Sequence, residues 1–157
     1  FQGGQMRPLS QRIEDARLVI ADSGVHGSTR EAVGGLRRRY EEDTGTVGPL
    51  IGALGALART AIAALNDGDA PALGAAMDRA HAVLAELGLS LPVLDDLTGA
   101  ARRAGALGAK LTGGGLGGCT IALADGPRAA DRIRAALERA GAAATWTYRM
   151  RVSEVNG

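Results

Sequence analysis

Hydrophobic residues recur with a helical period along most of this chain. From Leu50 to Leu65 apolar side chains return every three or four positions, and Asn66-Asp67-Gly68-Asp69 ends that segment. Earlier in the chain, Ser28 is followed three positions later by Glu31, the sequence pattern of a capping box at a helix N-terminus. The pattern predicts helices from Ser28 or Thr29 to about 42, around 50–65, over 73–87, from 92 onward and over 127–140.

Shorter runs have the composition and spacing of β-strands. Leu18–Ala21, within 17–22, and Cys119–Ala124 are apolar runs that predict buried strands. From Trp146 to Val152 apolar residues alternate with polar ones, which predicts a strand over 145–152 with one buried face and one wet face. With a further strand around residue 110, four strands and the helices between them predict an α+β fold, an antiparallel sheet backed by helices.

The overall composition argues against several functional classes. The chain has 157 residues, a net charge of +1 and 22% charged residues, which argues against nucleic acid as a partner. Arginines at 30 and 37–39 are followed at once by acidic residues at 41–43, the mixture expected of a solvated helix face. The single Cys119 permits no internal disulfide, and we find no signal peptide or long apolar span. We therefore expect a single domain over 1–157, a cytoplasmic location and no membrane partner.

Residues 108–124 carry the strongest chemical signal. Five glycines, at 113, 114, 115, 117 and 118, lie between two short apolar runs. A loop without Cβ atoms lets a ligand approach its backbone, and successive N–H groups there can form a concavity that binds an anion such as phosphate. A purely structural turn is the alternative, because the chain contains 24 glycines and some clusters arise from composition alone.

Two common phosphate motifs do not explain this loop. The P-loop motif ends in Lys-Ser or Lys-Thr, and neither follows the last glycine. Gly113, Gly115 and Gly118 formally match the dinucleotide-binding fingerprint, but that fingerprint requires a helix immediately afterwards. The next residues, Cys119–Ala124, predict a strand, so we interpret the match as accidental.

Three parts of the chain resemble the GHMP kinase family. Lys110–Cys119 is similar to the third conserved motif of that family, in the form found in mevalonate kinases. Leu18–Val33 resembles the strand–turn–helix that opens the C-terminal half of these enzymes, and Met77–His81 with Leu87–Asp95 resembles their internal helix pair. Gly114 stands where the family usually has alanine, a variant by which the chain is most similar to the bacterial mevalonate kinases.

The resemblance implies a fold, a reaction and a set of binding residues. The family's C-terminal domain is ferredoxin-like with additional helices. Its enzymes transfer the γ-phosphoryl group of ATP, with Mg²⁺, to a hydroxyl group, which in mevalonate kinases is the 5-hydroxyl of mevalonate. The phosphate-binding residues expected here are Gly113, Gly114, Gly115, Gly117 and Thr112, and the substrate-binding residues are Ser28 and Thr29. Each hydroxyl has a structural alternative, a backbone hydrogen bond for Thr112 and helix capping for Ser28 or Thr29.

The motifs that complete such an enzyme are absent from this sequence. We find neither the family's main nucleotide loop, nor its magnesium-binding Glu or Ser, nor its catalytic Asp with a nearby Lys. By resemblance we expect no catalytic or metal-binding residue in this chain, an N-terminal kinase half as partner, and no activity of the chain alone. We also expect self-association through the exposed interdomain face. Phe1–Gly4 is either the remnant of an expression tag or native sequence.

Four other polar side chains are interpreted as structural. Lys110 lies on a strand, where we expect it to point to solvent or pair with a carboxylate rather than to neutralise phosphate. His81 lies on an apolar helix face, which is typical of a buried histidine with satisfied hydrogen bonds. We expect Cys119 to pack as a small apolar residue and Asp22 to have a structural role.

Two alternative functions stay open on sequence alone. The chain could belong to a GHMP kinase for phosphomevalonate, homoserine or a sugar, although the segment Ser23–Val33 favours mevalonate. It could also be a non-enzymatic ferredoxin-like domain that binds a small ligand or mediates assembly. Activity measurements with a panel of substrates distinguish the first alternative from a mevalonate kinase. An N-terminal kinase half encoded upstream would argue against the second.

Overall fold

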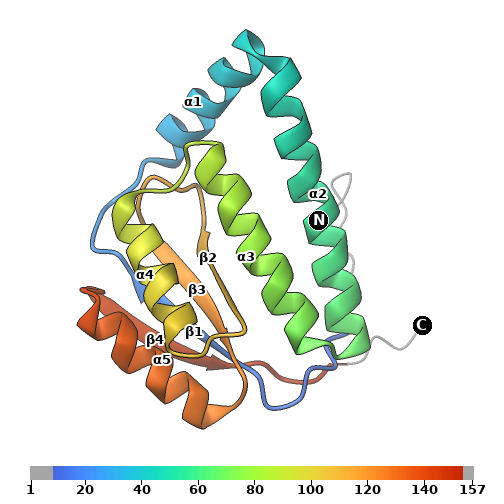
Figure 1. The fold of residues 1–157 in the computed structure, drawn as a ribbon, viewed down its shortest axis with the longest axis vertical. Helices are drawn as coiled ribbons and strands as arrows, with labels where there is room; N and C mark the ends of the chain where they lie inside the picture. The colour runs from blue at the N-terminus through green and yellow to red at the C-terminus, as the bar shows by residue number, and fades with distance from the viewer. Residues whose placement is uncertain (1–8, 154–157) are drawn as a thin grey trace.

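In this computed structural model, which describes residues 9–153, four strands form one antiparallel sheet (Figure 1). The strands are β1 (Arg17–Asp22), β2 (Gly108–Thr112), β3 (Cys119–Ala124) and β4 (Ala144–Arg149). They lie in the order β2-β3-β1-β4, and each neighbouring pair is antiparallel. The predictions for β1 and β3 are confirmed, whereas the final strand ends before the predicted 152. Phe1–Gly4 lies outside the described residues.

The helices of the described chain are distributed unequally between the strands. Four follow β1, namely α1 (Thr29–Glu42), α2 (Thr44–Asp67), α3 (Ala70–Glu86) and α4 (Pro92–Arg103). A fifth, α5 (Pro127–Arg139), connects β3 to β4. The order of elements and the order of strands are those of a ferredoxin-like fold, with α1–α4 in the place of its first helix. The predicted α+β class, ferredoxin-like with additional helices, is confirmed.

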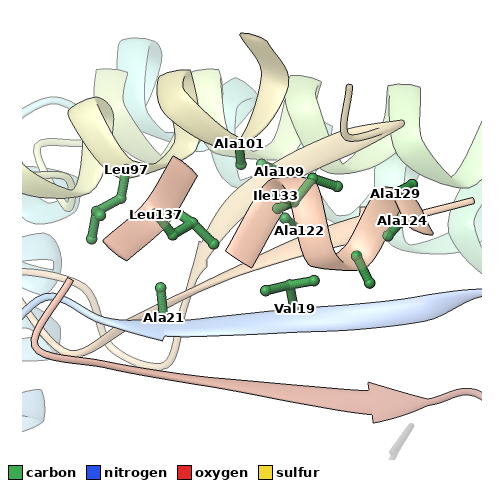
Figure 2. Close-up of a cluster of buried hydrophobic side chains, with 11 residues drawn as sticks. Val19, Ala21, Leu97, Ala101, Ala109, Ala122, Ala124, Ala129, Ile133 and Leu137 are labelled. Carbon is green, nitrogen blue, oxygen red and sulfur yellow. The ribbon is translucent and has the colours of Figure 1, made fainter. Parts of the chain in front are cut away.

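Helices α4 and α5 cover one face of the sheet (Figure 2). Val19 of β1 and Ala122 of β3 are paired across the sheet and fully buried beneath Ile133 of α5. Small side chains on the strands let the helices approach closely, while Leu97 and Leu137 fill the space between them. Each such fully buried leucine or isoleucine contributes roughly 1.5–3 kcal/mol.

Helix α3 packs directly against β2. A Cβ atom built on Gly74 of α3 would lie 2.2 Å from the Leu107 carbonyl oxygen, and one on Gly108 would lie 2.0 Å from the Gly74 carbonyl oxygen. Because real side chains never come this close, only glycine permits the two backbones to touch at this point. The helix and the edge of the sheet are therefore held at backbone distance.

Helix α2 forms over the predicted segment but is buried only in part. Val47 and Ala64 are its buried residues, and Leu50, Leu54 and Leu65 pack against the core as half-buried side chains. By length and composition alone α2 could cross a membrane, so the expectation of no long apolar span is wrong. Helices of soluble proteins can have the same length and apolar composition. Here α2 packs along α3 and contacts α1.

Strand β4 also corrects a prediction. Trp146 and Tyr148 were expected on a buried face, yet they are 52% and 57% exposed. They pair with Ile20 and Leu18 of β1, whereas α5 packs on the opposite face of the sheet, where Val19 lies. The alternation of the strand was recognised correctly, but its position at the edge of the sheet leaves both of its faces largely open.

Candidate functional site

The glycine-rich segment forms the loop from Gly113 to Gly118 between β2 and β3. A strand follows the loop, which confirms that the match to the dinucleotide fingerprint is accidental. Gly115 has a φ of +82°, and a Cβ there would lie 2.3 Å from the Leu89 carbonyl oxygen. Only glycine fits this position, because the backbone is left-handed and the neighbouring backbone leaves no room.

The loop packs against the segment that leads from β1 into α1. The Gly118 N–H donates to the Val25 carbonyl oxygen at 2.7 Å, and the Ser23 N–H donates to the Gly118 carbonyl oxygen at 2.9 Å. A Cβ on Gly114 would lie 3.2 Å from Thr29 Oγ1. The fold therefore brings together the two groups of residues that the sequence singled out, the glycine loop and the start of α1.

Hydrogen bonds divide the loop amides into two groups. The Leu116 N–H donates to the Leu89 carbonyl oxygen at 2.8 Å, and the Gly118 N–H is bound to Val25. Within residues 9–153, no hydrogen bond engages the amides of Gly113, Gly114, Gly115 and Gly117. These are the four glycines expected to bind phosphate. Gly113 and Gly114 are at least partly exposed, whereas Gly115 and Gly117 are buried, so the accessible donors lie at the beginning of the loop. Their role as ligands stays a prediction.

The start of α1 offers a second polar group. Ser28 is the N-cap, and its hydroxyl oxygen accepts a hydrogen bond from the Glu31 N–H at 3.3 Å, which confirms the predicted cap. Thr29 is the first residue of the helix and is exposed, and no hydrogen bond of the described chain engages its hydroxyl. The first turn of a helix favours anions, so Thr29 and the adjacent backbone could receive a carboxylate.

Thr112 is the last residue of β2 and leads directly into the loop. It is half-buried, and within the described residues its hydroxyl makes no hydrogen bond. The structural alternative, a bond from this hydroxyl to the backbone of its own strand, is therefore not supported. A role at the phosphate site stays a prediction.

Lys110 makes neither of the contacts expected of it. Its Nζ donates to the backbone carbonyl oxygen of the neighbouring Leu111, rather than pointing to solvent or pairing with a carboxylate. Burial lowers the pKa of Lys110. Lys110 therefore supplies a hydrogen-bond donor to the backbone near the end of β2.

His81 is buried and fully hydrogen-bonded, as predicted. Its Nδ1 accepts the Leu111 N–H at 3.2 Å, and its Nε2 lies 3.1 Å from both Asp95 Oδ1 and Thr98 Oγ1. Burial lowers the pKa of His81, and the Asp95 carboxylate opposes that shift only in part. The neutral ring thus accepts at Nδ1 and donates at Nε2.

Cys119 and Asp22 lie side by side where β1 pairs with β3. Burial and the negative charge of Asp22 raise the pKa of the Cys119 thiol, which disfavours the reactive thiolate. Asp22 Oδ1 accepts the Gly24 N–H at 2.9 Å and so shapes the turn after β1. Both contacts agree with the structural roles expected from sequence.

Sequence reasoning missed two residues that contact β2, Asp78 and Arg102. Asp78 Oδ1 accepts a hydrogen bond from the Ala109 N–H at 2.8 Å and another from Arg102 at 2.9 Å. A signal was present, since Asp78 and His81 are three residues apart on a helix and hence lie on one face. Without the fold, nothing in the sequence indicated that this face meets the strand before the loop.

The site is an open surface rather than a closed pocket. A hollow of about 280 Å³ reaches Leu116 of the loop and is lined otherwise by α1 and by residues 87–89. A larger hollow, about 750 Å³, lies between residues 14–15 and 147–152, and none of the predicted site residues lines it. Among residues 9–153, no group of three or more His, Cys, Asp or Glu side chains could hold a metal ion.

Comparison with known families and proteins gives a consistent picture. The family described as GHMP kinases C terminal matches residues 61–143. A mevalonate kinase of Thermococcus sibiricus is 38% identical over 146 residues, which are 90% of this chain and 43% of that protein. A mevalonate kinase of Pyrococcus abyssi is 43% identical over 114 residues, 69% of this chain and 34% of that protein. The chain spans less than half the length of these curated relatives, and both come from archaea, so the expected closeness to bacterial members is not supported.

Solved structures agree with the sequence relatives. The mevalonate kinase of L. major in complex with R-mevalonate superposes with a TM-score of 0.92 at 27% identity, over 98% of this chain and 48% of that chain. A phosphomevalonate kinase of Streptococcus pneumoniae superposes with a TM-score of 0.78 at 15% identity, over 93% of this chain and 43% of that chain. The second likeness concerns the fold alone.

Proposed function

This chain belongs to the GHMP kinases, as a C-terminal domain of that family, and on that premise we propose that it is part of an ATP-dependent mevalonate kinase. The similarity to archaeal mevalonate kinases over most of the chain supports this substrate class. Within the chain, the observation that carries the proposal is the group of unpartnered amides at Gly113, Gly114, Gly115 and Gly117 beside Thr29. We propose residues 1–157 as one domain of a cytoplasmic enzyme, with α2 lying on its surface.

The loop and the start of α1 have separate tasks in this proposal. ATP, when bound, supplies the γ-phosphoryl group that is transferred to the 5-hydroxyl of mevalonate. The glycine amides donate hydrogen bonds to the phosphate oxygens, and such preorganised donors stabilise the charge of the transferring group. The Thr112 hydroxyl adds a donor at the beginning of the loop. Thr29, with Ser28 shaping the helix end, receives mevalonate, whose carboxylate suits a helix N-terminus.

The remaining machinery is assigned to an N-terminal kinase half. The described residues contain no acidic cluster that fits Mg²⁺, so no step is assigned to the metal on these side chains. We propose that the catalytic base and the metal ligands lie in that other half, which closes the open site of this chain. The chain alone is then inactive.

We also propose that the isolated chain self-associates. Trp146 and Tyr148 expose apolar area on the open face of the sheet, and isolated domains tend to bury such area against a partner. The N-terminal half would cover this face in the longer protein.

A second candidate is a GHMP kinase for another substrate. A galactokinase of Streptomyces coelicolor is 42% identical over 84 residues, 53% of this chain and 21% of that protein, and this observation keeps a sugar substrate open. The shorter match makes it the weaker candidate.

A coupled ADP-release assay tests the proposal. The longer protein that carries this chain and the 157-residue chain alone are each given mevalonate, phosphomevalonate, homoserine and galactose. We expect turnover of mevalonate by the longer protein only. In that protein Thr29→Val should raise the KM for mevalonate more than that for ATP, whereas Val25→Thr, an exposed change in the same turn, should change neither. Turnover of another substrate in preference to mevalonate would overturn the substrate assignment.

A further inference from the structure

The outer edge of β2 is buried although no strand of residues 9–153 covers it. β2 lies at one end of the sheet, so in the described part of the chain one side of its backbone has no neighbouring strand. Ala109 and Leu111 are nevertheless almost completely buried, at 0% and 1% exposure. Buried backbone N–H and C=O groups require partners, and the partners of this edge must therefore come from side chains.

An ion pair supplies the partners of Ala109. Asp78 of α3 accepts the Ala109 N–H at 2.8 Å, and Arg102 of α4 donates to the Ala109 carbonyl oxygen at 3.2 Å. The two side chains are joined to each other at 2.9 Å. Together they present one acceptor and one donor to the strand, as the peptide group of a neighbouring strand would.

His81 supplies the partner of Leu111. Its Nδ1 accepts the Leu111 N–H at 3.2 Å, and the other side of the ring is held by Asp95 and Thr98. Ser90 in turn donates to Asp95 Oδ1 at 2.6 Å. The ring is thus fixed in the orientation and the tautomer that accept the strand amide.

We propose that Asp78 and His81 are positioning residues that hold β2 in place and thereby aim the amides of the glycine loop. Leu111 is followed by Thr112 and then by the first loop residue, so a displacement at this edge is passed directly to the loop. The other end of the loop enters β3, which is secured between two strands. Of the two ends of the loop, the end that continues β2 is therefore the one whose position depends on side chains.

The catalytic consequence rests on the proposed function, but the structural one does not. Amide hydrogen exchange of the 157-residue chain therefore tests the positioning role without requiring activity. His81→Asn keeps an acceptor near the position of Nδ1, whereas His81→Gln places its polar group nearer Nε2 and removes the acceptor for Leu111. In His81→Gln we expect the hydrogen-bonded amides of Leu111, Leu116 and Gly118 to exchange about fivefold faster or more, with His81→Asn close to the wild type.

Faster exchange of Leu111 alone, with the bonded loop amides of Leu116 and Gly118 unchanged, would overturn the proposal. If His81→Gln fails to fold, Asp78→Asn against Asp78→Ala gives the same comparison, because asparagine keeps an oxygen for the Ala109 N–H. Ile133→Val in α5 is the matched control, since it weakens the core without removing a hydrogen bond from the edge of β2.

The kinetic test uses the longer kinase. We expect His81→Gln to lower kcat/KM for ATP by about tenfold, because a small misplacement of binding groups is costly. His81→Asn should restore most of that loss, and Ile133→Val should leave it unchanged at matched stability. Kinetics of His81→Gln equal to wild type would overturn the catalytic part. If no substrate is turned over, the proposed function fails, and the exchange experiment still decides whether the edge is held in this way.

Discussion

The two edge strands of the sheet are supported in opposite ways. β2 is buried, and side chains of α3 and α4 occupy the polar groups along its outer edge. β4, at the other end of the sheet, has side chains that are largely exposed, and its Trp146 and Tyr148 are more than half exposed. The supported edge leads into the glycine loop, and the open edge carries none of the predicted site residues. Polar side chains that bind the backbone therefore lie at the edge that leads into the glycine loop rather than at the open edge.

The largest effect should come from filling the loop that β2 supports. Gly115→Ala places a methyl group 2.3 Å from the Leu89 carbonyl oxygen on a left-handed backbone. Gly141→Ala, in the turn before β4, has the same kind of backbone but no atom within 4 Å. Left-handed backbone alone costs about 1–2 kcal/mol, so Gly141→Ala should lose that amount and Gly115→Ala clearly more. Urea denaturation measures both, and equal losses would contradict the crowding of the loop.

Removing one arginine at each edge should give the next largest difference. Arg102→Met removes the side-chain donor of the Ala109 carbonyl and one of the two donors of the Asp78 carboxylate, which should cost about 1–2 kcal/mol. Arg149 Nη2 lies 3.5 Å from Asp15 Oδ1 in an exposed ion pair. Arg149→Met should therefore change the free energy of unfolding by about 0.5 kcal/mol or less. Thermal denaturation of the two variants checks this order. A larger loss for Arg149→Met would show that the two edges do not differ as described.

The stability of the folded chain should depend on pH through His81. Burial lowers the pKa of His81 from its ordinary 6.5, so in mildly acidic solution the unfolded chain binds this proton more readily than the folded one. Asp95, Arg102 and Lys110 also act on the pKa of the ring. Asp95 favours protonation, but burial has the larger effect, and the charges of Arg102 and Lys110 oppose protonation as well. The stability from neutral His81 is present above about pH 6.5 and is lost as pH falls through the folded pKa, by at most about 1.4 kcal/mol per pH unit.

Unfolding midpoints at pH 7.5 and 5.0, compared between the wild type and His81→Asn, isolate this contribution from other acidic groups. The wild type should lose more stability than the variant on acidification. The same pH dependence in both proteins would contradict a buried, neutral His81.

The smallest effect on folding is expected at the open edge. Trp146→Lys should alter stability by about 0.5 kcal/mol or less, because the side chain is already exposed. The same change should abolish self-association of the isolated chain if its open sheet face is the surface involved. Sedimentation across a range of concentrations measures the association. Unchanged association in the variant would assign it to another surface.

The local pattern of the sequence was sufficient for much of the fold and for part of the site. The run Cys119–Ala124 forms the predicted strand, and Ser28 caps α1 as predicted, because neighbours in the chain specify both structures. The cluster of glycines at 113–118 marked the loop, because glycine permits left-handed backbone and close approach, but composition alone left a purely structural turn open. The resemblance assigned separate binding roles to the loop and to Thr29, and the structure shows that Gly114 and Thr29 lie side by side.

The failures share one physical cause, which is that burial depends on what lies across the fold. The alternation around Trp146 correctly indicates a strand, but it does not indicate whether a helix will cover that strand. The apolar positions of α2 likewise indicate a helix without indicating how much of it will be covered. Lys110 and Asp78 form hydrogen bonds with backbone atoms, and the pattern of apolar and polar positions does not predict partners of that kind.

The most direct test of the account is a nuclear magnetic resonance titration of the longer protein, labelled with ¹⁵N at glycine, with ATP. The account predicts shifts of the amide signals of Gly113, Gly114, Gly115 and Gly117, while Gly141 beside the open edge stays unchanged. Saturable ATP binding that leaves these four signals in place would contradict the claim that the loop held by β2 binds phosphate.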